Sequence, residues 1–145
     1  MLLSFIAGKL PFAVKGGYDF VDVRDAAAGV VACAEKGAKG RGYILSGHYA
    51  NIRDILEAAK RTLDIKRRVI YLPIALAKLA APLYEKRSVR KKMPLYFTPY
   101  AVSVLGSNSL YSRRAAASAF GFSPRQVAES IRDTVLWLKE SKTHA

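Results

Sequence analysis

The stretch YDFVDVRDAAAGVVACAEKG, residues 18–37, constrains the fold most, because a strand-like pattern changes within it into a helical one. Residues 18–23 alternate aromatic or apolar side chains with polar ones, as half-buried strands do. Small residues then dominate positions 26–36, which predicts a helix that can lie close against a sheet or another helix. Asp25 is expected to cap this helix and Gly37 to end it. The chain should therefore pass directly from a strand into a helix.

Two more strands are indicated downstream. Residues 43–46 (YILS) form a short apolar run that ends at Gly47, as in a strand buried on both faces. Residues 68–72 contain β-branched side chains and favour a strand as well. A strand covered on both sides belongs to a parallel sheet, whose neighbours are delivered by crossover connections. The chain offers few such neighbours, so we expect some of them to lie outside this sequence.

Helices account for most of the remaining pattern. Cap residues or prolines mark five expected starts, at Asn51, Pro73, Thr98, Ser112 and Ser123. Apolar stripes indicate the faces of these helices, among them Leu76, Leu79, Ala80 and Leu83 in the helix over residues 73–86, and Val127, Ile131, Val135 and Leu138 in the last one. The order strand–helix–strand–helix–strand, followed by helices, predicts an α/β fold in a single unit over residues 1–145.

The sequence carries a large positive charge. It has 24 lysine and arginine residues against 11 aspartates and glutamates, a formal net charge of +13 over 145 residues. This basicity favours an anionic partner such as nucleic acid, a phosphorylated ligand, a membrane surface or an acidic protein. Cys33 is the single cysteine, which excludes an internal disulfide, and two distant histidines do not predict a metal site.

Neither export nor a membrane span is expected from the apolar segments. The first residues, MLLSFIAGKLPF, lack a basic start and a long apolar centre, so we do not expect a signal peptide. Residues 69–84 are interrupted by Pro73, Lys78 and Pro82 and are too short and broken to span a bilayer. We therefore expect a cytoplasmic location.

Three stretches carry a resemblance to a known family. They are YDFVDVRDAAAGVVACAEKGAKGRGYILSGHYANIRDIL, LPIALAKLAAPLYEK and FTPYAVSVLGSNSLYSRRAAASAFGFSPRQVAESIRDTVLWLKE. In order and spacing, from about residue 9 to residue 140, the chain resembles the carboxy-terminal half of extended short-chain dehydrogenases/reductases. These are the NAD(P)-dependent sugar epimerases and dehydratases, with dihydroflavonol-reductase-like members. The resemblance implies the carboxy-terminal portion of a Rossmann-type fold, with one or two strands of the parental parallel sheet and a mostly helical substrate-binding subdomain.

The resemblance also implies a role for the charges between residues 22 and 25. Residues 18–23 would leave the nucleotide-binding sheet for the substrate domain, and residues 43–46 would return as the last strand of that sheet. Asp22 and Arg24 would then pair with each other and with loops across the junction. Alternatively, Arg24 would face an anionic or polyhydroxyl substrate, because a guanidinium suits bidentate contact with a phosphate or carboxylate.

Two motifs that carry the family's chemistry are missing from the 145 residues. One is a G-x-x-G-x-x-G turn, which receives the cofactor pyrophosphate, and the other is a Tyr-x-x-x-Lys acid/base pair. Gly37-x-x-Gly40-x-Gly42 comes after a helix and before a strand, which is the wrong context, and Tyr49-x-x-x-Arg53 has arginine in place of lysine. We therefore assign no catalytic and no cofactor-binding residue. The parent enzyme would use NAD or NADP, whereas this chain, from a split gene or truncated reading frame, is expected to bind no cofactor and to be inactive alone.

The resemblance implies a substrate cleft, for a sugar nucleotide or a flavonoid-like or lipid-linked molecule. Our candidates for lining it are Tyr18, Arg24, Tyr100 and Asn108, and a packing or capping role stays open for each. The missing half would normally cover residues 26–36 and 43–46. Because exposed apolar surface marks interfaces, we expect that half, or a second copy of the chain, as a partner.

Two hypotheses from other functional classes remain open. The basic tracts at residues 60–61, 66–68 and 86–92 have tyrosines nearby and could bind single-stranded nucleic acid. No helix-turn-helix, zinc or RNA-recognition motif accompanies them, and a solvated basic surface is the simpler explanation. Residues 72–84, beside a basic tract, could form an interfacial helix on anionic lipid, although an apolar stripe at helical spacing is more often core.

Overall fold

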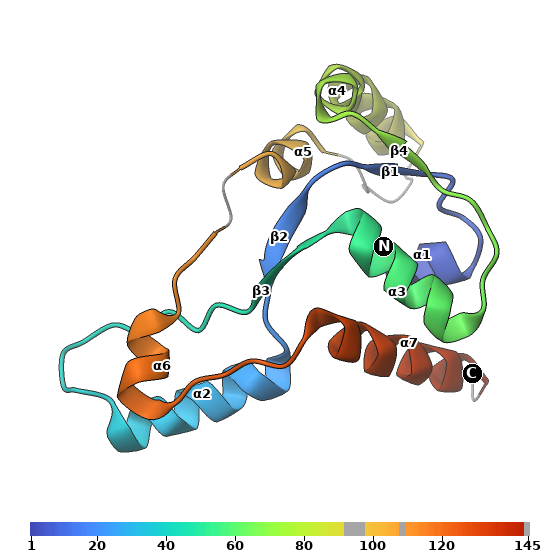
Figure 1. The fold of residues 1–145 in the computed structure, drawn as a ribbon. Coiled ribbons are helices and arrows are strands. Elements are labelled where there is room, and N and C mark those ends of the chain that lie inside the picture. Colours follow the sequence, from blue (N-terminus) through green and yellow to red (C-terminus); the bar gives the residue numbers. More distant parts are fainter. Residues whose placement is uncertain (92–97, 108–109, 144–145) are drawn as a thin grey trace.

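The computed structural model describes residues 1–91, 98–107 and 110–143 (Figure 1). Its elements, in chain order, are α1 (Leu2–Ile6), β1 (Phe12–Val14), β2 (Gly17–Phe20), α2 (Val23–Lys36), β3 (His48–Asn51), α3 (Ile52–Leu63), β4 (Ile70–Leu72), α4 (Ile74–Arg90), α5 (Pro99–Leu105), α6 (Arg114–Phe120) and α7 (Val127–Thr143). The fold is mixed α/β with mostly helices, which confirms the predicted class.

The described strands form two small sheets. β1 and β4 pair in parallel, with Phe12 opposite Ile70. β2 and β3 pair antiparallel, with Tyr18 opposite Ala50. Gly17 begins β2, and a side chain does not fit there because a Cβ atom would clash with the carbonyl oxygen of Ala50 on β3. β1 and β2 follow each other closely in sequence, yet they belong to different sheets, because β1 pairs with β4 and β2 pairs with β3.

The strand expected at residues 43–46 is not formed. Residues 41–47 adopt no regular secondary structure in the described chain, and Ile44 is exposed. The end of this segment is held by Asp19 of β2, whose carboxylate accepts hydrogen bonds from Ser46 Oγ (2.6 Å) and from the Gly47 backbone N–H (2.7 Å). An apolar run becomes a strand only where another strand satisfies its backbone, and none of the described strands pairs with residues 43–46.

The main core lies between α3 and α7, with α1 packed against α3 (Figure 1). Leu56 and Ala59 of α3, Val135 of α7 and Phe5 of α1 are fully buried. The apolar stripes of α3 and α7 therefore face the core, as their periodicity predicted. The predicted start of α3 is also confirmed, because Asn51 precedes it with the extended backbone of an N-cap residue.

Helix α4 presents to solvent the face that its periodicity marked as apolar. Leu76, Leu79 and Leu83 are 56%, 81% and 73% exposed, whereas Ala77 and Ala81 on the opposite side are buried. The small alanines let α4 lie close to β1 and α5, where they pack with Val14 and Val102. A stripe at helical spacing predicts a helix and an apolar face, but it does not say whether another part of the protein covers that face.

Figure 1 shows three groups of elements. α4, α5, β1 and β4 lie at one end, α2 and α6 lie at another, and α1, α3 and α7 form a third group, with β2 and β3 running between them. None of the described helices is long and apolar enough to cross a membrane. The candidate functional features lie at two places, the amino-terminal end of α2 and the space beside α5.

Candidate functional site

Helix α2 begins at Val23, earlier than expected, and its N-cap is Asp22 rather than Asp25. The Asp22 backbone is extended, and its Oδ1 atom accepts a hydrogen bond from the backbone N–H of Arg24 at 2.9 Å. Strand β2 ends at Phe20, so the chain turns into the helix sooner than the alternation of residues 18–23 indicated. The Asp25 carboxylate, in the first helical turn, is therefore available for contacts with other segments.

Arg24 links α2 to α7. Its Nη2 atom lies 2.7 Å from Asp22 Oδ2 and 2.9 Å from Asp133 Oδ2 of α7. The hydroxyl of Ser130, also on α7, donates to Asp22 Oδ2 at 2.6 Å. The Asp22 side chain is 6% exposed, so these contacts satisfy a nearly buried carboxylate. This arrangement is the pairing across the junction that the sequence left open as one of two roles for Arg24.

Asp25 holds the segment that leads into α7. Its Oδ1 atom lies 2.7 Å from Arg125 Nη2, and its Oδ2 atom accepts a hydrogen bond from the Arg125 backbone N–H at 2.8 Å. The fork of the guanidinium and the adjacent N–H thus enclose one carboxylate. Together, Asp22, Arg24, Asp25, Arg125 and Asp133 form what we call the junction network.

The junction network stays ionised at neutral pH. Hydrogen bonding to Arg24 holds the pKa of Asp22 well below its usual range and also lowers the pKa of Asp133. Arg125 lowers the pKa of Asp25 in the same way, and the hydrogen bond to Asp22 raises the pKa of Arg24. The Nε and Nη2 donors of Arg24 are directed at carboxylates, and an anionic ligand would have to compete with Asp22 and Asp133 for them.

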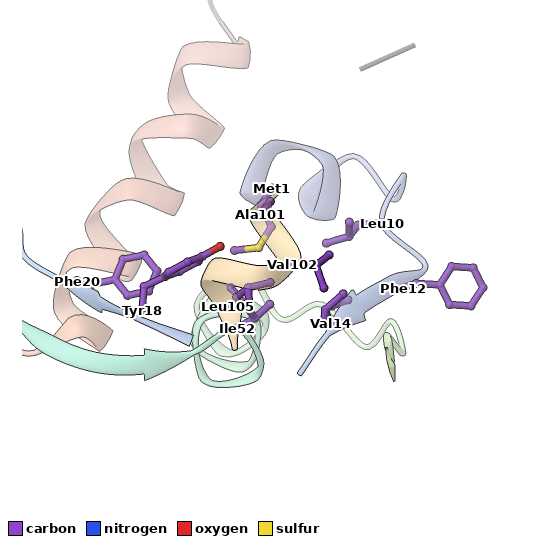
Figure 2. Close-up of a pocket in the computed structure, with 11 residues that line it drawn as sticks. Met1, Leu10, Phe12, Val14, Tyr18, Phe20, Ile52, Ala101, Val102 and Leu105 are labelled. Atoms are coloured by element: carbon purple, nitrogen blue, oxygen red, sulfur yellow. The ribbon is translucent and has the colours of Figure 1, made fainter. Parts of the chain in front are cut away.

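A cavity of about 280 Å³ lies at the other end of β2, between β1, β2 and α5 (Figure 2). Apart from the tyrosine hydroxyl, its walls are apolar side chains, among them Leu10, Tyr18, Phe20, Ile52, Val102 and Leu105. No lysine, arginine or carboxylate lines it among the described residues. The cavity can therefore surround an apolar group, with one hydroxyl available as a polar contact.

Tyr18 supplies that hydroxyl. Its ring packs edge-to-face on Phe20, with 5.8 Å between the ring centroids, which fixes its direction. Figure 2 shows the hydroxyl pointing toward Met1, whereas the Phe12 ring points away from the other labelled side chains. Burial raises the pKa of the Tyr18 hydroxyl, so the group is a neutral donor at physiological pH.

The structure describes three of the four predicted substrate residues, and their surroundings differ. Tyr18 lines the cavity, and Arg24 belongs to the junction network instead. Tyr100 lies on α5 beside Ala101, which lines the cavity, but Tyr100 itself is 79% exposed. Asn108 lies outside the described residues.

Sequence reasoning missed the α5 residues of the cavity, although it predicted the helix. Val102 and Leu105 are three positions apart and so share a face of α5, a spacing that could have identified them. The sequence around Asp133 and Arg125 does not indicate that these side chains pair with the start of α2. Asp133 is 109 residues from Arg24, and Arg125 is 100 residues from Asp25.

The glycines at positions 37, 40 and 42 do not build a dinucleotide site. They follow α2, and no helix begins after them before β3. A Cβ atom at Gly40 or Gly42 would meet nothing within 4 Å, so neither glycine is required by a close approach of other described residues. A pyrophosphate cradle needs a strand, a tight turn and then a helix amino terminus, and this segment has the opposite order.

Comparisons with known proteins relate nearly the whole chain to part of larger ones. No family model matches it. Sterol demethylase protein B of Methylococcus capsulatus is 27% identical over 143 residues, which cover 96% of this chain and 43% of that protein. Among solved structures, gox2253 matches with a TM-score of 0.75 at 22% identity, over 97% of this chain and 43% of that one.

A nucleoside-diphosphate-sugar epimerase from Pseudomonas aeruginosa matches with a TM-score of 0.71 at 20% identity, over 97% of this chain and 41% of the epimerase. The chain thus spans less than half the length of each of these proteins. At this identity the likeness concerns the fold. The chain has the fold of one part of gox2253 and of the nucleoside-diphosphate-sugar epimerase.

Proposed function

We propose that the chain is the substrate-binding portion of an extended, NAD(P)-dependent short-chain dehydrogenase/reductase, and that the cavity at Tyr18 receives an apolar substrate. The observation that carries this proposal is the cavity itself, whose described lining is apolar except for one tyrosine hydroxyl. The fold supports it, because 97% of the chain superposes on part of an epimerase.

The lining favours a lipid-like or polycyclic molecule over a sugar nucleotide. A diphosphate needs arginine, lysine or several N–H donors, and taking its charge out of water without them is strongly unfavourable. The Tyr18 hydroxyl suits a ligand with one hydroxyl or carbonyl group at its end. The relative from Methylococcus capsulatus is a sterol demethylase protein, and sterols are apolar polycyclic molecules.

The cofactor and the acid/base groups would come from a partner. The described residues do not fit a dinucleotide, so we assign no catalytic step to them. Val30 and Val31 of α2 and Ile44 are exposed apolar residues on elements far from the cavity. We propose that this surface receives the cofactor-binding half, and that copies of the chain associate through it when that half is absent.

A titration with a fluorescent sterol tests the substrate class. We expect saturable binding to the wild-type chain, at least about tenfold weaker binding to Ala101→Phe, which fills the cavity, and no competition from a nucleoside-diphosphate sugar. The matched control is Ala117→Phe, which adds the same ring at an exposed position of α6. Equal affinity of Ala101→Phe and wild type, or full competition by the sugar nucleotide, would contradict the proposal.

A turnover assay tests whether the cofactor site and the acid/base groups come from a partner. The pure chain should not oxidise NADH or NADPH with any substrate, because its sequence carries no Tyr-x-x-x-Lys pair and no glycine-rich G-x-x-G-x-x-G turn. Mixing it with a separately expressed cofactor-binding half should restore turnover. Cofactor-dependent activity in the pure chain would show that this part of the proposal is wrong.

A further inference from the structure

The outward face of α4 is apolar in its first half. Leu76, Leu79 and Leu83 are exposed and follow each other at spacings of three and four, which places them on one side of the helix. Phe12 and Ile70, paired in register on β1 and β4, add exposed apolar surface at the same end of the molecule (Figure 1). Single exposed leucines are common, but a contiguous group of this kind marks a contact surface.

The same face is basic in its second half. Lys86, Arg87 and Arg90 follow Leu83 at three, four and seven positions and are exposed. None of them forms an ion pair with a carboxylate of the described chain. Glu85 is the one acidic residue of α4. We call Leu76, Leu79, Leu83, Lys86, Arg87 and Arg90 the α4 face.

We infer that the α4 face docks on an anionic lipid bilayer, with the helix lying in the plane of the surface. The leucines would enter the boundary between head groups and acyl chains, and the three cations would lie at the level of the phosphates. Stable attachment of a peripheral helix needs an apolar and an electrostatic contribution, and this face supplies both. The unpaired cations are the feature that favours anionic lipid over an apolar protein partner.

Docking in this way would also place the cavity at Tyr18 in the end of the molecule that contacts the bilayer. β1 and α5, which line the cavity, belong to the same end of the molecule as α4 (Figure 1). The docking inference stands on the α4 face itself and does not depend on the proposed substrate.

Sedimentation of the full 145-residue chain with vesicles tests the inference. We expect binding to vesicles of phosphatidylcholine with phosphatidylglycerol, and weak binding to phosphatidylcholine alone. Replacing Leu79 and Leu83 together by serine should weaken binding by about tenfold or more. The matched control replaces Leu136 and Trp137 by serine, two exposed apolar residues on α7, and should bind like wild type.

A second pair of variants separates the local cations from the overall charge of the protein. Lys86→Gln, Arg87→Gln and Arg90→Gln together should weaken binding by about fivefold per cation, because each basic side chain near an anionic surface contributes about 1 kcal/mol. The control neutralises three exposed cations near the end of α2, Lys36, Lys39 and Arg41, and removes the same net charge. If both triple variants bind equally, attraction of a basic protein as a whole is the explanation and the inference is wrong.

A labelled cysteine reports whether the leucines enter the bilayer. In a Cys33→Ser background, an environment-sensitive dye at Leu79→Cys should shift to shorter wavelength with phosphatidylglycerol vesicles, whereas the same dye at Val30→Cys should not. Far-UV circular dichroism of each variant verifies the fold, which these exposed positions should not disturb. Absence of vesicle binding by the wild type, or equal dye shifts at both positions, would overturn the inference.

Discussion

At the scale of single residues, Asp22 joins three functions in one side chain. It caps α2, accepts a hydrogen bond from Ser130 of α7 and pairs with Arg24. Because the carboxylate is nearly buried, removing the donors of Arg24 or Ser130 leaves a desolvated charge with fewer hydrogen bonds, which costs more than an exposed ion pair contributes. The charged residues between β2 and α2 therefore connect the start of α2 to α7.

Replacement of Asp22 by alanine should lower the free energy of unfolding by at least about 1 kcal/mol, the usual effect of removing an N-cap. Asp22→Asn keeps a capping oxygen but loses the charge, so its loss should be smaller. Urea denaturation of the three proteins measures both effects. An alanine variant as stable as wild type would show that the cap and the contacts with α7 do not stabilise the fold.

Lowering the pH should reduce the stability that the junction network contributes, because its carboxylates become protonated. The folded-state pKa values of Asp22, Asp25 and Asp133 are lowered, so their contribution to stability is fully present above the unfolded value of about 4. It is then lost as the pH falls from about 4 toward the folded-state values. Urea midpoints measured between pH 7 and pH 3 should fall most steeply below about pH 4. Arg24→Gln should show a flatter acid limb, and an unchanged limb in that variant would contradict the assignment.

At the scale of elements, the small residues of α2 serve close packing against the segments around it. Gly29 is the buried residue of this helix, and a Cβ atom on it would approach Leu45 and Phe122 to 3.0 Å. The sequence predicted close approach from the composition of the helix, and the position of Gly29 confirms it. The approach is made to residues 41–47 and to the end of α6, rather than to a parallel sheet.

Gly29→Leu should lower the free energy of unfolding by about 1–3 kcal/mol, because the added side chain would overpack the contact with Leu45 and Phe122. Ala27→Leu adds a large side chain at an exposed position of the same helix and serves as the control. Thermal unfolding followed by circular dichroism compares the two. Equal unfolding midpoints of the two variants would mean that α2 can move away from Leu45 and Phe122 without loss of stability.

The apolar stripes of α7 and α4 show what the periodicity of a sequence predicts and what it leaves undetermined. In α7, the positions expected to be inside include the buried Ile131 and Val135. In α4, Leu79 and Leu83 were expected on a packed face and are exposed, because Ala77 and Ala81 make the contact with the sheet. Both helices were predictable, since spacing along the chain fixes which residues share a side. Which side packs depends on distant segments.

At the scale of the whole molecule, we assign roles to two of the exposed apolar surfaces that the described residues form. One is the α4 face with its neighbours on β1 and β4, and the other is formed by Val30 and Val31 of α2. The two differ in charge pattern and in position, which is why we propose a bilayer for the first and a protein partner for the second. The cavity at Tyr18 lies on the side of the first.

Light scattering of the pure chain should show self-association if the α2 surface lacks its partner. Val30→Ser with Val31→Ser should shift the chain toward the monomer, because apolar area no longer gains by leaving water. Val30→Ile with Val31→Ile keeps the surface apolar and should associate like wild type. A monodisperse monomer in the wild-type sample would contradict this prediction.

The local features of this protein were determined by its sequence. Helix starts at Asn51 and Thr98, the stop at Gly121 and the strand before Pro73 depend on caps, turn residues and β-branched side chains within a few positions. The missing Tyr-x-x-x-Lys and glycine-rich motifs were also plain from the residues alone. These features are local because their hydrogen bonds close within one or two turns of the chain.

Only the tertiary structure decided what each side chain meets. Arg24 and Asp25 find partners more than ninety residues away, on or just before α7. Residues 43–46 had the composition of a buried strand, yet no described strand pairs with them, and Asp22 took the capping role that the pattern gave to Asp25. The physical reason is the same in each case. Charge pairing, strand pairing and burial depend on which distant segments approach, and a local pattern along the chain does not contain that information.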